Sequence, residues 1–99
     1  MIHLNPFNFA TGGTITFTGA IPGDGIPADV RFRFEKAPYP DVNPAFDAGT
    51  VTVSGVDENT YTITVPAQDA ANNYSSLLMY VDTRDAPVIV KNIVVTDSE

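Results

Sequence analysis

Asp29-Val30-Arg31-Phe32-Arg33-Phe34-Glu35-Lys36 is the stretch that decides the fold, because its apolar and charged side chains alternate without a break. Successive side chains of a β-strand point to opposite faces of its sheet, so this pattern predicts a half-buried strand. The core-facing side chains are Val30, Phe32 and Phe34, and the opposite face carries Arg31, Arg33 and Glu35. A proline-rich loop with two aromatic residues follows, within residues 37–47.

The rest of the chain consists of similar short runs, separated by clusters of Gly, Pro, Asn and Asp. Helical periodicity is missing, and Ala67–Asn73 is expected to be a loop or a single turn. This pattern is typical of an all-β, antiparallel two-sheet β-sandwich. The expected strands are Gly13–Gly19, Ala28–Lys36, Gly49–Ser54, Thr60–Val65, Ser76–Asp82 and Val88–Thr96, with an earlier edge strand within Ile2–Phe9.

The same alternation predicts which other side chains face the core. They are Ile15, Phe17, Val51, Val53, Tyr61, Ile63, Val65, Leu77, Met79 and Val81. In the last strand the alternation breaks, since Val90 is followed by Lys91 and Asn92 before Ile93 and Val95. One extra residue at that point predicts a β-bulge.

Composition restricts the class of protein. With 99 residues, 43% of them hydrophobic, the chain is expected to form a single domain over residues 1–99. Twelve acidic and five basic side chains give a net charge of −7, so we expect neither nucleic acid nor a membrane as a partner. No apolar run approaches the roughly 20 residues of a membrane span. Cysteine is absent, which excludes a disulfide framework and a thiolate zinc site.

Three motifs resemble those of jelly-roll carbohydrate-binding modules in the style of families 4 and 9. They are the stretch from Phe32 to Pro40, Ser76–Asp82 and the stretch from Val90 to Val95, and the resemblance covers about residues 13–97. Such modules are appended to secreted bacterial laminarinases and related family 16 glycoside hydrolases. The resemblance implies a jelly-roll sandwich, an extracellular location within a larger protein, and an attached catalytic domain.

A sugar site on a sandwich needs planar polar groups for the hydroxyls and a ring for the C–H face of the pyranose. Arg31, Arg33 and Glu35 would supply the polar row, and the alternative is a charge ladder that keeps an exposed sheet soluble. Tyr39 and Phe46 are the candidate rings, unless the prolines fold the loop back and bury them. Tyr80 and Asp82 join the row if their strand pairs with Val30–Lys36, where Tyr80 would also pack against an arginine. Arg84 is expected to be a solvated charge.

Clusters of Asp and Asn carry oxygen ligands suited to calcium. They are Asp24 with Asp29, then Asp41, Asn43 and Asp47, and finally Asp97 with Glu99. Such residues mostly form turns, so we expect no cofactor, and a structural calcium ion is the alternative. No catalytic set is visible, because the single histidine, His3, lies near the terminus and no nucleotide-binding loop is present.

We therefore expect a non-catalytic, monomeric module that binds a polysaccharide and holds an attached glycoside hydrolase on its substrate. A laminarin-type β-1,3-glucan is favoured, and arginine in the site leaves sulfated or uronic chains such as carrageenan, porphyran and alginate open. The alternative is a structural sandwich that spaces or stabilises a neighbouring domain without binding a glycan.

Overall fold

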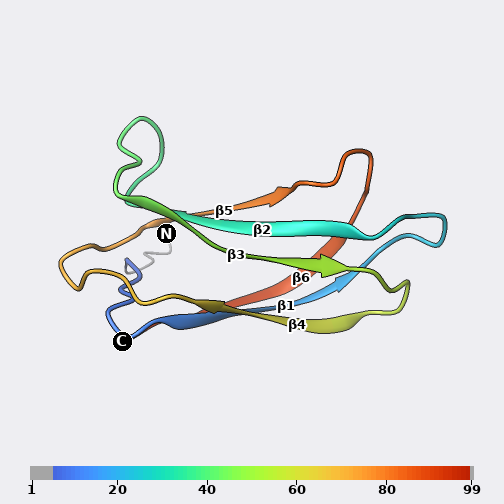
Figure 1. Cartoon of the computed structure of the whole chain (residues 1–99), viewed down its shortest axis with the longest axis horizontal. Helices are drawn as coiled ribbons and strands as arrows, with labels where there is room; N and C mark the ends of the chain where they lie inside the picture. Colours follow the sequence, from blue (N-terminus) through green and yellow to red (C-terminus); the bar gives the residue numbers. More distant parts are fainter. Residues whose placement is uncertain (1–5, 99) are drawn as a thin grey trace, which may run out of the picture.

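The computed structural model describes residues 6–98 and contains six antiparallel strands and no helix in that range (Figure 1). Strands β4, β1 and β6 form one sheet in that order, and β3, β2 and β5 form the second. The predicted two-sheet sandwich is therefore confirmed. The strands are β1 (Gly13–Ala20), β2 (Ala28–Glu35), β3 (Ala45–Val53), β4 (Asn59–Val65), β5 (Ser76–Val81) and β6 (Ile89–Thr96).

Connectivity is dominated by crossings between the two sheets. Only β2 and β3 are joined as neighbours within one sheet, and each of the other connections passes from one sheet to the other. A jelly roll has eight strands, whereas residues 6–98 form six, so the finer jelly-roll connectivity stays a prediction. The described residues hold no helix that could cross a membrane.

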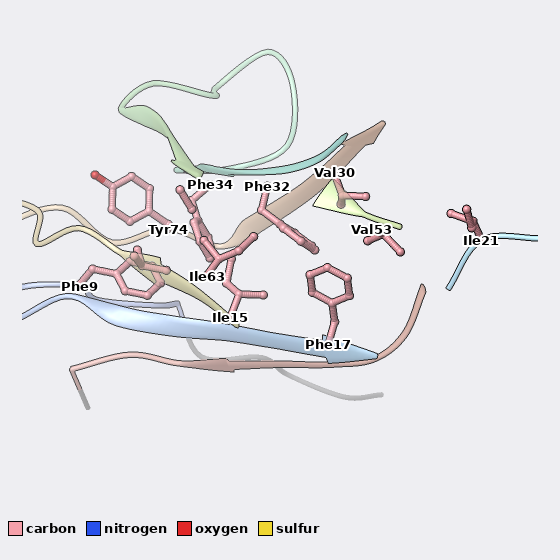
Figure 2. Close-up of a cluster of buried hydrophobic side chains, with 12 residues drawn as sticks. Phe9, Ile15, Phe17, Ile21, Val30, Phe32, Phe34, Val53, Ile63 and Tyr74 are labelled. Atoms are coloured by element: carbon pink, nitrogen blue, oxygen red, sulfur yellow. The ribbon is translucent and has the colours of Figure 1, made fainter. Parts of the chain in front are cut away.

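Aromatic side chains fill the core between the sheets. The structure buries Phe32 and Phe34 completely, as the alternation of β2 predicts, and Phe17 packs on Phe32 with ring centroids 5.5 Å apart. Figure 2 shows the rings of both sheets pointing toward one another. The largest fully buried side chains are Tyr74, Phe9, Phe17, Phe32, Phe34, Ile15, Val30, Val53 and Val65.

The segment before β1 also contributes to this core. Phe7 makes an isolated antiparallel bridge with Tyr74, with hydrogen bonds of 2.7 and 2.9 Å in the two directions. Phe9 is fully buried, and its ring centroid lies 4.7 Å from that of Phe34. Most of the expected edge strand within Ile2–Phe9 lies outside the described residues.

Strand β3 begins four residues earlier than the expected Gly49, and a bulge explains the difference. Phe32 pairs with Gly49, whereas the next residue, Arg33, pairs with Asp47, so Ala48 is the extra residue. Gly49 has a φ of +143°, a conformation that glycine adopts readily. The bulge reverses the alternation of β3: without it, Asp47 would share the core-facing side of Val51 and Val53.

Phe46 is consequently not a loop residue. It pairs with Phe34 in β3, is partly buried, and stacks on the Phe34 ring at 5.5 Å. Of the two alternatives for Phe46, the one in which its ring is buried is therefore correct, although the bulge rather than the prolines turns its side chain into the core.

The predicted bulge in the last strand is confirmed. Thr16 of β1 pairs with Val94 and Thr18 pairs with Lys91, so two residues of β6 lie opposite the single residue between these threonines. Asn92, one of the two, has a φ of +58°, in the left-handed region that Asn tolerates better than most residues.

The sandwich is closed along one side and open along the other. Strands β3 and β4 lie against each other across the sheets, and β5 and β6 make no comparable contact. Met79 and Val81 pair with the buried residues Phe32 and Val30, so they face inward as predicted. They are nevertheless 40% and 38% exposed, and the expectation that they are buried was wrong. The reason is that the edge strands β5 and β6 do not cover each other as the edge strands β3 and β4 do.

Candidate ligand-binding face

The outer face of the sheet β3-β2-β5 carries the polar row that the sequence predicts. Arg31 and Arg33 stand on the central strand, on the side opposite Phe32. Antiparallel register places Tyr80 of β5 directly beside Arg31 and Asp47 of β3 directly beside Arg33. This face, defined by Arg31, Arg33, Glu35, Asp47, Tyr80 and Asp82, is called the arginine face below.

Arg31 is held by three neighbouring side chains. Its Nε and Nη2 atoms donate to the two carboxylate oxygens of Asp82 at 2.9 and 3.2 Å, and Nη1 donates to Asp47 at 3.0 Å. Its Cζ atom lies 4.4 Å from the centroid of the Tyr80 ring, which is within the range of a cation–π contact. Both expected roles of Tyr80 are therefore met: it leaves the core and packs against an arginine.

Arg33 extends the network to Glu35, the next outward-facing residue of β2. Its Nε donates to Glu35 at 3.2 Å, and its Nη1 donates to the same Asp47 oxygen that accepts from Arg31, at 3.3 Å. Glu35 is only 9% exposed, less than its place on an outer face predicts. Asp47 thus joins the two guanidinium groups into one network across three strands.

Asp47 is the residue of this face that the sequence does not place there. The expected loop reaches to the start of the strand at Gly49, which leaves Asp47 in a turn cluster. The signal that could have located it is Gly49 itself, since a glycine inside an alternating run often marks a bulge. Once one residue is skipped, Asp47 falls on the same face as Arg33.

Two positive guanidinium groups and three carboxylates make the arginine face slightly negative. Hydrogen bonds to the carboxylates raise the pKa of Arg31 and of Arg33, with burial acting in the opposite direction. The hydrogen bond from Arg31 lowers the pKa of Asp82 below its ordinary value, and the charge of Arg31 adds to the effect. The network therefore favours full ionisation of Asp82 at neutral pH.

This shift gives a pH-dependent prediction for Asp82→Asn. A carboxyl with a lowered folded-state pKa stabilises the fold above its unfolded pKa, about 3.9, and loses that contribution as the pH falls through the folded-state value. We expect Asp82→Asn to lower the Tm modestly at pH 7 and to have a smaller effect in acid, where the parent has also lost the charge. Thermal melts from pH 7 downward measure this, and an equal difference in Tm at every pH would contradict it.

Tyr39 stands apart from the network. It lies in the loop between β2 and β3, which projects from the sheet at the end of the molecule where β2 finishes (Figure 1). The side chain is 88% exposed, so the alternative that the prolines bury it is wrong. Among residues 6–98, no hydrogen bond, ring contact or ion pair joins Tyr39 to the arginine face.

Within residues 6–98 the remaining candidates form no further site, and Glu99 and His3 lie outside the described residues. In the described part of the chain, no three His, Cys, Asp or Glu side chains gather in an arrangement that could hold a metal ion. Asp29 instead accepts a hydrogen bond from Thr52 at 2.5 Å, and Asp97 accepts one from the backbone nitrogen of Asn8 at 2.8 Å. The side chain of Arg84 is 95% exposed, as expected of a solvated charge.

A shallow cavity of about 390 Å³ lies at the end of the sandwich, lined in part by Lys36, Asn73 and Ser75. No family model, curated protein or solved structure matches this chain. The similarity to carbohydrate-binding modules therefore rests on the three sequence motifs, and the argument for function rests on the arginine face.

Proposed function

We propose that the domain is a non-catalytic carbohydrate-binding module that holds a polysaccharide along the arginine face. The observation that carries the proposal is the gathering of six polar or aromatic side chains onto one face, from three adjacent strands and from Asp82, which directly follows β5. The side chains of Asp47 and Asp82 are 49% and 43% exposed, so their carboxylate oxygens can accept hydrogen bonds from sugar hydroxyls. Arg31 and Arg33 hold these carboxylates in fixed positions.

Tyr39 is the proposed ring platform. The Tyr80 ring already packs against Arg31 on one side, whereas the ring of Tyr39 is free to stack on the C–H face of a pyranose. A polysaccharide that lies along β2 would contact the carboxylates of the arginine face, and it would contact Tyr39 beyond the end of the strand. A laminarin-type β-1,3-glucan is the favoured ligand, and the module would keep an attached, secreted glycoside hydrolase close to it.

A structural spacer is the second candidate, and one observation favours it. The printed hydrogen bonds already engage three donor atoms of Arg31 and two of Arg33 with carboxylates of the same sheet. A network that is satisfied within the protein does not need a ligand, and it can act as a ladder that keeps the sheet soluble.

Affinity gel electrophoresis against soluble polysaccharides distinguishes the two. The panel would contain laminarin and other neutral glucans beside carrageenan, porphyran and alginate. We expect laminarin to retard the parent domain, and Tyr39→Ala or Arg33→Ala to weaken retardation by at least about tenfold in Kd. The melting curve of Tyr39→Ala should change little, because substitutions at exposed sites typically shift stability by about 0.5 kcal/mol or less. Arg33→Ala should melt at a lower temperature than the parent, because it leaves the largely buried Glu35 carboxylate without its donor.

Ile26→Ala is the matched control, because Ile26 is 48% exposed in the loop before β2, away from Tyr39 along the strand. It should bind like the parent. Failure of every polysaccharide to retard the parent would overturn the proposal in favour of the spacer. Retention of binding in both Tyr39→Ala and Arg33→Ala would move the site to the loops at the end of the sandwich, where the cavity beside Lys36 lies.

A further inference from the structure

The cavity at the end of the sandwich lies outside the arginine face. It holds about 390 Å³, a volume typical of sites for small molecules. Two of its lining residues, Lys36 and Pro44, are the first and last residues of the loop that carries Tyr39. The cavity therefore lies at the base of this loop, which projects where β2 ends (Figure 1).

Lys36 brings a positive charge to this cavity. The chain has five Lys and Arg side chains, and the other four form ion pairs with carboxylates: Arg31, Arg33, Arg84 and Lys91. Within residues 6–98, no carboxylate pairs with Lys36, whose side chain is exposed. The adjacent Glu35 accepts from Arg33 on the arginine face instead. Of the residues outside that range, only Glu99 is acidic.

The other polar side chains of the cavity are neutral. Asn72, Asn73 and Ser75 line it, and none of the described lining residues is one of the chain's twelve acidic residues. The Oδ1 atom of Asn73 accepts from Asn8 at 2.9 Å, and no acceptor among residues 6–98 engages its Nδ2. Amides and hydroxyls both donate and accept, which matches the hydroxyls of a sugar. One cation among such groups suits a sugar with one negative charge.

A second hollow, of about 480 Å³, adjoins the first. The two share Pro6 and Asn73 in their linings, and the described residues of the second lining carry no charge. A glycan could therefore place an acidic residue beside Lys36 and neutral residues in the adjoining hollow. The net charge of −7 repels a polyanion, which favours one acidic sugar within a neutral chain over a continuous polyuronate.

We propose that the cavity is a subsite for a single acidic sugar residue, whose carboxylate or sulfate group accepts a hydrogen bond from Lys36 Nζ. Hydrogen bonds between two charged groups are roughly twice as strong as those between neutral groups, so this contact would select acidic over neutral sugars. The proposal rests on the proposed function only in taking the anion to be part of a glycan. The subsite itself shares no residue with the arginine face.

NMR titration of the full chain with glucuronosyl-xylobiose, which carries one uronic acid, tests the subsite. We expect the backbone amides of Asn72, Asn73 and Ser75 to shift. Binding should weaken at least about tenfold in Kd when the carboxyl group of the probe is reduced to a neutral alcohol. It should also weaken as NaCl is added, because salt screens the contact. Neocarrabiose sulfate, used in parallel, distinguishes a sulfate ester from a carboxylate as the source of the charge.

Lys36→Gln should weaken binding of the acidic probe at least about tenfold and leave binding of the reduced probe unchanged. Its fold should persist, because the backbone of Lys36, which bonds to Val42, Pro44 and Ser75, is retained. Arg84→Gln is the matched control: it removes the same charge from a side chain that is 95% exposed in the loop between β5 and β6. It should bind both probes like the parent.

The subsite and the arginine face fail separately. Absence of shifts with both acidic probes, or the same Kd for Lys36→Gln, Arg84→Gln and the parent, would overturn the subsite. Equal weakening in the two variants would also overturn it, since the loss would then reflect net charge. Laminarin should retard Lys36→Gln like the parent. If laminarin retards neither protein while the acidic probe still binds through Lys36, the arginine face is overturned as a glycan site and the subsite stands.

Discussion

Phe34→Ala should lower the free energy of unfolding by about 3–5 kcal/mol, the range found for truncation of a buried phenylalanine. The Phe34 side chain is fully buried and contacts the rings of Phe7, Phe9 and Phe46, at centroid distances of 5.6, 4.7 and 5.5 Å. Its removal therefore leaves a cavity at the point where the N-terminal segment meets both sheets. Domains are typically stable by about 5–15 kcal/mol, so the variant should be close to unfolding at room temperature.

Urea denaturation followed by circular dichroism measures this effect. Tyr39→Ala is the control, since it also removes an aromatic ring, but one that is 88% exposed. We expect its denaturation midpoint to match that of the parent. If Phe34→Ala had the same urea denaturation midpoint as the parent, the assignment of the buried face of β2 would be inverted.

Gly13→Ala should be the second most damaging change, even though it adds only one methyl group. A Cβ atom on Gly13 would overlap the backbone oxygen of Thr96 and would lie 3.0 Å from the ring of Phe9. Since backbone cannot move aside as a flexible side chain can, relief requires the end of β6 to separate from β1. Overpacking of this kind typically costs about 1–3 kcal/mol, and occasionally more.

Gly23→Ala is the matched control for that prediction, because no atom lies within 4 Å of a Cβ built at Gly23. Thermal melts of the two variants should differ clearly, with Gly23→Ala close to the parent. Equal melting temperatures for Gly13→Ala and the parent would mean that β1 and β6 pair less closely at this point than the structure has them.

The alternation in β2 was enough to predict the burial of Phe32 and Phe34 and the common face of Arg31 and Arg33, and the short runs along the rest of the chain predicted the sandwich. Alternation fixes which side chains share a face, because the period of a strand is two. It does not fix where a strand skips a residue, and so it missed the bulge at Ala48 that turns Phe46 inward and Asp47 outward. The bulge in β6 was predictable because Lys91 and Asn92 interrupt an otherwise apolar run.

Burial of a core-facing residue also depends on whether the opposite sheet covers it. The sequence of a single strand does not show where the strands of the opposite sheet lie. Met79 and Val81 have the alternation of core residues, yet they are exposed because β5 lies at the edge where the two sheets do not meet. Strand order is decided by long-range pairing. Similarly, the alternation placed Arg31 and Tyr80 on polar faces, and only the register of β2 with β5 brings them together.

The pairing of β1 with β6 has a consequence for how the domain reaches its native state. Thr14 pairs with Thr96, so the two strands come from opposite ends of the sequence. Closing so long a loop costs chain entropy before any contact is gained, and proteins dominated by such distant pairings typically fold within about milliseconds to seconds. During synthesis, β1 and β4 can meet early, but their sheet has no third strand until β6 has been made. A nascent chain therefore carries β1 with one side unpaired while β2 to β5 are being made.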